Sequence, residues 1–257
     1  MAGLGARIVL VARDRGRGEH TLARLRELAP DAGHSAHYVD LSLMAEVKRV
    51  GAEIAAAEPR IDVLVNNAGN VFATRKVTAE GLERTFALNH MAYFILTHCL
   101  RERLVASAPA RVVCTASSAH QRQELDLDDL QLLRGYGPLK AYDRSKLCNI
   151  LFTRELARRL AGTGVTANCV HPGFVVTNLG QRGGGVFKYL VRASMIVAGR
   201  PDKGARTIAY LAGSPDVADV SGGYFYDCRQ IEPSRAAKDD ATAQRLWRES
   251  EKLAGFA

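Results

Sequence analysis

Short apolar segments alternate with longer amphipathic segments along all 257 residues of the chain. The apolar segments have the length and the β-branched content of strands, and they lie at 7–12, 34–40, 61–66, 110–117, 165–170 and 223–227. Helical patterns occupy 15–29, 43–58, 78–106, 136–161 and about 236–253. Strands that are apolar on both faces and joined by helices form parallel sheets covered on both sides. The sequence therefore predicts an α/β fold with a doubly wound parallel sheet, in one domain over 1–257.

The composition limits the expected binding partners and the expected cellular location. The net charge of +8 comes mostly from scattered arginines, without a run of five basic residues. The simplest interpretation is a solvated surface; the alternative is an electropositive groove for an anionic cofactor. Nucleic acid is not expected, because no basic helix carries interleaved aromatics. Five widely spaced cysteines without metal-ligand spacing predict reduced thiols, no metal and a cytoplasmic protein. No segment has the roughly 20 apolar residues of a membrane span.

Tyr142 and Lys146 are the residues with the clearest chemical potential. Four residues apart on a predicted helix, they project from one face. A free tyrosine has a pKa of about 10 and exchanges protons poorly at neutral pH. A neighbouring ammonium favours the phenolate and should lower that pKa. The pair is therefore a candidate general acid and base for a carbonyl or an alcohol, and the alternative is an ordinary Tyr and Lys on an amphipathic helix.

Five motifs in order resemble the short-chain dehydrogenase/reductase family over essentially the whole chain. They are Asn66-Asn67-Ala68-Gly69, Asn89, Ser117, Tyr142-x-x-x-Lys146, and His171-Pro172-Gly173 followed by Thr177. Further features resemble the retinol dehydrogenase and WW-domain oxidoreductase branch of this family. They are the 25-residue step from Ser117 to Tyr142, the stretches 117–120 and 127–130, and the tail 223–228 with Arg245-Leu246-Trp247. The resemblance implies a Rossmann-like fold and an NAD(P)-dependent oxidoreductase.

The resemblance also implies catalytic roles. Tyr142 would exchange the proton with the substrate oxygen, and Lys146 would lower its pKa and bind the nicotinamide ribose. Ser117 would polarise the substrate oxygen, because the family's serine lies three residues before the histidine matched by His120; Ser118 is the alternative. Asn89 would hold a water in a proton relay to Lys146, or else is a hydrogen-bonded helix asparagine.

Cofactor contacts follow in the same way. Asn66, Asn67, Ala68 and Gly69 would lie beside the adenine ribose, although much of their role could be structural. Asp40 would contact the adenine, or alternatively would cap the helix that begins near Ser42. Pro172, Gly173 and Thr177 would line the nicotinamide.

The position that would select the cofactor holds Ala12, followed by Arg13. In NAD-binding folds an acidic residue there binds the ribose hydroxyls and repels a 2′-phosphate. Because a small residue and a guanidinium suit a phosphate, we predict a preference for NADP(H) over NAD(H).

One family element is missing from the sequence. The family begins with a strand and a glycine-rich loop that binds pyrophosphate, whereas residues 1–5 read as the end of the following helix. We therefore expect an N-terminally incomplete domain, with the neighbours of the first strand unpaired. The complete protein is expected to be an active reductase; the alternative is a catalytically impaired binding or regulatory protein.

The expected substrate is a small lipophilic aldehyde, ketone or alcohol. Residues 174–200 should cover it, since Phe187, Tyr189, Leu190, Met195 and Ile196 make this segment apolar. The alternative is that most of these side chains belong to a helix packed on the core. A hydrolase is not favoured, because the chain has no Gly-x-Ser-x-Gly elbow. Homo-oligomerisation through the helices 78–106 and 136–161 is common in the family and is left open by the sequence.

Overall fold

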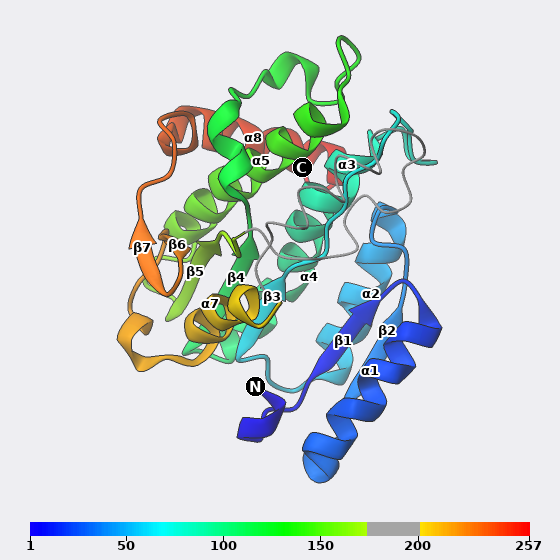
Figure 1. Ribbon diagram of the computed structural model, residues 1–257, viewed down its shortest axis with the longest axis vertical. Coiled ribbons are helices and arrows are strands. Elements are labelled where there is room, and N and C mark those ends of the chain that lie inside the picture. Colours follow the sequence, from blue (N-terminus) through cyan, green and yellow to red (C-terminus); the bar gives the residue numbers. More distant parts are fainter. Residues whose placement is uncertain (174–200) are drawn as a thin grey trace.

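The computed structural model describes residues 1–173 and 201–257. Thr177 and the predicted substrate segment 174–200 lie outside the described residues. The rest forms the predicted layered α/β architecture, with helices on both faces of parallel strands (Figure 1).

The described strands form two sheets. In the first, β1 (Val9–Ala12) pairs in parallel with β2 (Ser35–Tyr38). In the second, four parallel strands follow one another and a fifth closes the edge in the antiparallel direction. These strands are β3 (Val63–Asn66), β4 (Ala110–Thr115), β5 (Val165–Val170), β6 (Tyr224–Tyr226) and β7 (Arg229–Ile231).

The break between the two sheets falls where the sequence predicts a missing strand. Within the described residues, β1 pairs only with β2, and β3 pairs only with β4. The facing edges of β1 and β3 therefore have no strand partner, as expected. The two sheets are joined by packing, since Val9 and Val11 contact the same hydrophobic core as Leu64.

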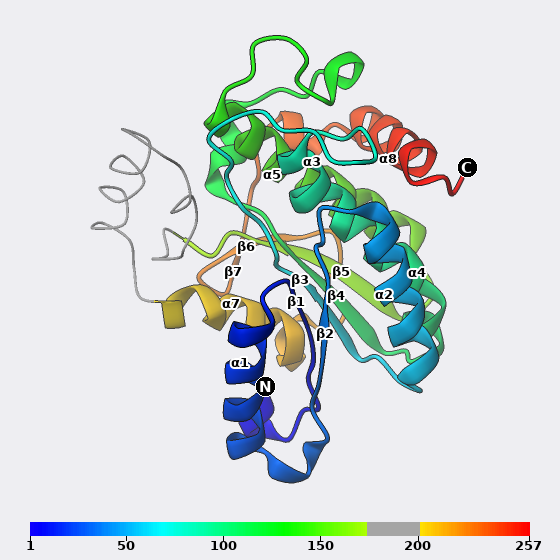
Figure 2. The same cartoon turned by 90° about the vertical axis from the view of Figure 1, so that its right-hand side faces the viewer.

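Helices cover both faces of the sheets (Figure 2). Helices α1 (Arg15–Leu28) and α7 (Pro201–Gly213) lie on the first face. Helices α2 (Met44–Ala57), α4 (Ala92–Ala106) and α5 (Pro138–Arg159) lie on the second, and α8 (Asp240–Ala254) packs outside α5. The main core lies under the second face and includes the fully or almost fully buried side chains of Val50, Ile95, Val112 and Leu151.

The predicted helix over 78–106 is wrong at its start. Residues 78–83 form a turn in which Gly81 adopts a left-handed conformation, with a φ of 84°. Glu83 then caps the helix, because its carboxylate accepts hydrogen bonds from the amides of Thr85 and Phe86 at 2.8 and 2.9 Å. The helix continues as α3 (Arg84–Phe86), a π-helical turn at Ala87–Met91, and α4.

The strand β7 was not predicted. It forms a hairpin with β6 through Asp227 and Cys228, which have φ values of 48° and 61°. Tight hairpins need positive φ at both central residues and usually place glycine there. Because neither residue is glycine and β7 is exposed, the sequence has no hairpin signal at this point.

Candidate active site

The parallel strands bring most of the predicted site residues to one edge. Arg13 follows β1, Asp40 lies just beyond β2, and Asn66–Gly69 ends β3. Ser117 lies just beyond β4, and His171-Pro172-Gly173 follows β5. In open α/β sheets ligands bind at the carboxyl ends of the strands, so this edge is the candidate active site.

Tyr142 and Lys146 lie on α5, beside the end of β4. Lys146 is buried, and its Nζ donates a hydrogen bond to the Thr115 carbonyl at 3.0 Å. The same Nζ lies 5.5 Å from the centroid of the Tyr142 ring. Asn149, one turn further along α5, donates to the same carbonyl at 3.1 Å. Two side chains of α5 therefore fix the end of β4 against the helix that carries Tyr142.

The pKa of Tyr142 shifts in the direction opposite to our expectation. Burial raises it to about 12, and hydrogen bonding from the Ser117 side chain offsets only part of that rise. Lys146 is not among the groups that lower it, and its ammonium donates instead to the Thr115 carbonyl. Burial lowers the pKa of Lys146 itself to about 8. Tyr142 is therefore fully protonated at neutral pH in this geometry.

Ser117 is the serine that interacts with Tyr142. It is also the N-cap of the 3-10 helix Ser118–Arg122, and its hydroxyl accepts a hydrogen bond from the Ala119 amide at 3.2 Å. Ser118 lies within that short helix. The geometry thus favours Ser117 over Ser118 as the partner of Tyr142.

Asn89 is fully buried in the π-helical turn. Its Nδ2 donates to the Asn70 carbonyl at 3.0 Å and to Ser145 Oγ at 2.9 Å, and its Oδ1 accepts from the Asn70 amide at 2.9 Å. These bonds hold the loop after β3 against α5. A Cβ placed on Gly69 would lie 3.3 Å from Asn89 Oδ1 and 3.4 Å from Lys146 Nζ, so bare backbone is needed where the three residues meet.

The two asparagines that end β3 point in different directions. Asn66 is buried and donates to Thr97 Oγ1 of α4 at 2.9 Å, which is a structural contact. Asn67 instead accepts from Thr115 Oγ1 at 2.9 Å on the site side. Only Asn67 of the pair lies in the network around Lys146.

Asp40 lines a separate cavity beyond the end of β2, and Arg13, which follows β1, acts on the Asp40 charge. Asp40 Oδ1 accepts from the amide and hydroxyl of Ser42 at 2.9 and 2.7 Å. Burial opposes ionisation of Asp40, but the Ser42 bonds and the charges of Arg13 and Arg84 bring its pKa below the usual value. The cavity has a volume of about 220 Å³, and its lining consists of Asp40, Ser42, Leu43, Lys76, Val77, Thr78 and Arg84.

The alternative role of Asp40 as a helix cap is not what the structure shows. Helix α2 begins at Met44, two residues after the Ser42 turn. Its first amides, those of Met44 and Ala45, donate to the Glu80 carboxylate, each at 2.8 Å. Glu80 therefore takes the capping role, which leaves the Asp40 carboxylate beside the cavity.

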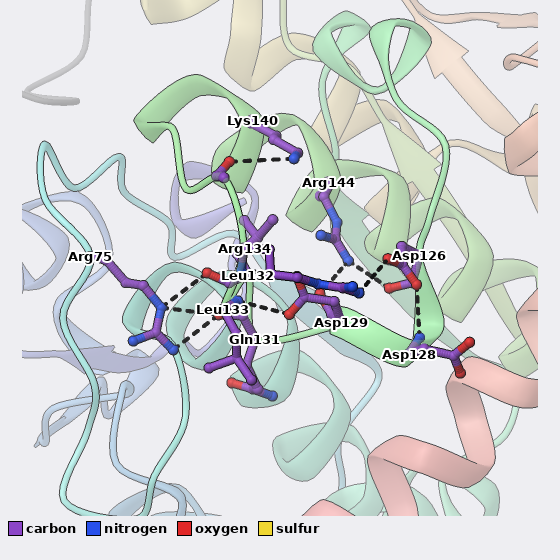
Figure 3. A network of polar contacts seen from close by, with 11 residues as sticks. Arg75, Asp126, Asp128, Asp129, Gln131, Leu132, Leu133, Arg134, Lys140 and Arg144 are labelled. Atoms are coloured by element: carbon purple, nitrogen blue, oxygen red, sulfur yellow. Dashed lines mark hydrogen bonds and ion pairs between the residues drawn. The ribbon is translucent and has the colours of Figure 1, made fainter.

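A charged network holds the loop between Ser117 and Tyr142 (Figure 3). Arg144, which is buried on α5, donates to the carbonyls of Asp126 and Asp129 at 2.7 and 2.9 Å. From the other side, Arg75 donates to the carbonyls of Gln131 and Leu132 at 3.2 and 3.1 Å. Residues 123–137 are thus tied to α5 and to the loop after β3.

The segment after β5 is only partly described. His171 Nδ1 accepts from the Gly173 amide at 3.1 Å, and the His171 ring stacks on Tyr226 with centroids 4.8 Å apart. Gly173 has a φ of 81°, which a residue with a side chain rarely adopts. Burial, with a smaller contribution from nearby His120, lowers the pKa of His171 to about 4. His171 is therefore neutral at physiological pH.

Sequence reasoning missed Thr115, Asn149 and the contacts of His120. Thr115 joins Asn67 to Lys146 through its hydroxyl and carbonyl. Asn149 lies one turn beyond Lys146 on the same helix face, and that spacing was a usable signal. His120 was used only to place Ser117, whereas in the structure its ring is fully buried and bonds to the Ser117 carbonyl.

Comparison with known proteins agrees with this geometry. The family model for short chain dehydrogenases matches residues 1–183. The chain is a short-chain dehydrogenase/reductase. Human retinol dehydrogenase 14 is 40% identical over 271 residues, with 98% of this chain and 80% of the relative covered. The short-chain dehydrogenase/reductase described here thus belongs to the retinol dehydrogenase branch, as its motifs predicted.

Solved structures show the same fold for this short-chain dehydrogenase/reductase. An uncharacterized protein from Mycobacterium Paratuberculosis superposes with a TM-score of 0.75 at 32% identity, covering 97% of this chain and 84% of that one. The Pseudomonas aeruginosa RhlG/NADP active-site complex superposes with a TM-score of 0.66 at 26% identity, covering 87% of each chain. Among the described residues, no helix combines the length and the apolar character of a membrane span.

Proposed function

We propose that this short-chain dehydrogenase/reductase interconverts an apolar aldehyde or ketone and its alcohol, with NADP(H) preferred over NAD(H). The observation that carries the proposal is the convergence of Ser117, Tyr142 and Lys146 at the end of β4. Retinol dehydrogenases are among its relatives, which supports a retinoid-like, lipophilic substrate class.

The residues present suit two parts of a nicotinamide dinucleotide. Near Gly69, bare backbone lies beside the buried ammonium of Lys146, and this fits a ribose carrying hydroxyl groups. Near the cavity, Arg13 and Arg84 act on Asp40, and a guanidinium fits a 2′-phosphate. When bound, the cofactor would supply or accept the hydride.

The chain's own residues would handle the proton and the oxygen. In reduction, Tyr142 would donate its phenolic proton to the carbonyl oxygen, and its raised pKa keeps that proton in place at neutral pH. Ser117 would donate a hydrogen bond to the same oxygen. Lys146, whose ammonium lies 5.5 Å from the centroid of the Tyr142 ring, would bind the ribose hydroxyls of the cofactor beside the tyrosine. In oxidation the same groups would act in reverse.

Two serine variants test the catalytic assignment. Ser117→Ala should lower turnover of aldehydes and ketones with NADPH by about 100-fold or more, as expected for a lost oxyanion donor. Ser118→Ala serves as the matched control, and its turnover should change little. Loss of turnover in Ser118→Ala alone would show that the catalytic serine is the neighbouring one.

The cofactor preference has its own test. Titration with NADPH and NADH should give tighter binding of NADPH, and Arg13→Ala should reduce that preference. Comparable binding of the two cofactors, unchanged in Arg13→Ala, would refute it.

A second candidate function is favoured by the break in the sheet. Because β1 and β3 each leave an edge without a strand partner in the described part of the chain, cofactor affinity could be low enough for the protein to act as a binding or regulatory protein. Binding and turnover separate the two functions. A chain that binds a lipophilic carbonyl compound but neither binds NADPH nor turns over would favour the second.

A further inference from the structure

His120 connects the candidate catalytic serine to the C-terminal part of the fold. Its ring is fully buried and lies between three segments. The first is the turn after β4, which carries Ser117; the second is β6, where the Tyr224 ring meets His120 edge-on with centroids 5.2 Å apart. The third is the stretch between β7 and α8, through Ser234.

The hydrogen bonds of His120 define one tautomer. Nδ1 lies 2.6 Å from the Ser117 carbonyl, and a carbonyl can only accept, so Nδ1 carries the proton. Nε2 is then free to accept, and the Ser234 amide donates to it at 3.0 Å. The ring is thus a bridge that donates to Ser117 and accepts from Ser234.

We propose that His120 is a positioning residue that holds the Ser117 backbone so that the serine hydroxyl faces Tyr142. The inference rests on the proposed role of Ser117 in the oxidoreductase reaction. Besides the bond from the His120 ring, the Ser117 carbonyl accepts, among the described contacts, only a longer bond from the His120 backbone amide at 3.3 Å. The hydroxyl oxygen accepts from the Ala119 amide within the same turn, so the direction of the hydroxyl depends on the backbone of that turn, and a shifted Ser117 carbonyl would turn the hydroxyl away from Tyr142.

Two substitutions separate the two ends of the bridge. In His120→Asn the side-chain amide nitrogen stands close to the place of Nδ1 and keeps a donor for the Ser117 carbonyl. In His120→Gln the longer amide reaches toward Ser234 and leaves the Ser117 carbonyl without its side-chain donor. Both variants lose the aromatic ring, so their effects on packing should be similar.

The expected result is a split in kcat between these variants. His120→Asn should stay within about threefold of the wild type, whereas His120→Gln should lose about 10- to 100-fold in kcat with little change in the NADPH dissociation constant, as for a misplaced catalytic group. His34→Gln is the matched control: His34 is also buried, but its Nδ1 accepts from the Ile8 amide beside β2. This control should retain kcat.

A double-mutant cycle ties the effect to Ser117. If His120 acts through Ser117, the effect of His120→Gln should disappear in a Ser117→Ala background, since coupled residues are not additive. Three results would overturn the inference. The first is an equal loss of kcat in His120→Asn and His120→Gln, and the second is an undiminished loss of kcat for His120→Gln in the Ser117→Ala background. The third is an Nε2–H tautomer of His120 in ¹⁵N NMR. Unchanged turnover in the Ser117→Ala single variant would instead refute the proposed function on which this inference rests.

Discussion

Replacing Lys146 with methionine should stabilise the protein at neutral pH, although Lys146 belongs to the proposed catalytic set. Burial lowers the pKa of Lys146 from 10.5 to about 8. Since one pKa unit corresponds to about 1.4 kcal/mol, keeping this amine charged at pH 7 costs about 3 kcal/mol of the free energy of unfolding. Methionine fills a similar apolar volume and carries no charge.

The substitution also removes a hydrogen bond. The bond from Lys146 Nζ to the Thr115 carbonyl, at 3.0 Å, contributes about 1 kcal/mol. The carbonyl keeps a partner, because Asn149 also donates to it. The net expected gain for Lys146→Met is therefore about 2 kcal/mol at pH 7.

The sign of the pH dependence follows from the two pKa values. Because the pKa of Lys146 is lower in the folded protein, the unfolded chain binds more protons between about pH 8 and 10.5. The wild type therefore gains stability relative to Lys146→Met as the pH rises through this window. The advantage of the variant should be full below pH 8, fall to about half by pH 9 and vanish near pH 10.

Urea unfolding at pH 7 and pH 9 measures this difference. Trp247, the only tryptophan in the sequence, is buried against Phe94 and Phe152 and reports unfolding by fluorescence. Lys140→Met is the matched control, since Lys140 is exposed on the same helix and should change stability little at either pH. A Lys146→Met protein that is less stable than the wild type at pH 7, or a difference that does not depend on pH, would refute the reasoning.

Three further variants test other parts of the site. Tyr142→Phe removes the proposed proton donor and should lower kcat by about 10²- to 10⁴-fold with an unchanged melting temperature; retained kcat would exclude Tyr142 as the acid. Asn89→Leu breaks the three hydrogen bonds of a buried side chain and should lower the free energy of unfolding in urea by about 3 kcal/mol, so an unaffected midpoint would contradict the network. Arg144→Met removes the donor to two loop carbonyls and should speed limited proteolysis within 123–137; equal cleavage rates would show that this loop is held by other contacts.

The sequence predicted the parallel strands well because their signal is local. Val63-Leu64-Val65 and the run over 110–115 are apolar and β-branched, so their strands were placed within a few residues. The helix start near Thr78 was missed because a turn at Gly81 and the Glu83 cap interrupt an otherwise helical pattern. The cap of α2 was also missed, since Glu80 reaches it from 36 residues along the chain.

The site was predictable as far as the topology determines it. Parallel strands place their carboxyl ends together, so Ser117 and the loop at Gly69 could be assigned to one edge. The direction of the Tyr142 pKa could not be predicted in this way, because it depends on burial and on where Lys146 points. The hydrogen bond between His120 and Ser234 joins residues 114 positions apart, and no local pattern in the sequence predicts it.

The proposed chemistry and the proposed cofactor preference depend on different parts of the fold. Ser117, Tyr142 and Lys146 are held by contacts among β4, α5 and the turn after β4, all within the larger sheet and its helices. Arg13 and Asp40 follow β1 and β2, which form the separate sheet. A dinucleotide that contacts both groups must reach across the break between the sheets. A change in how the two sheets pack should therefore alter cofactor affinity more than kcat, whereas a change at His120 or Thr115 should do the reverse.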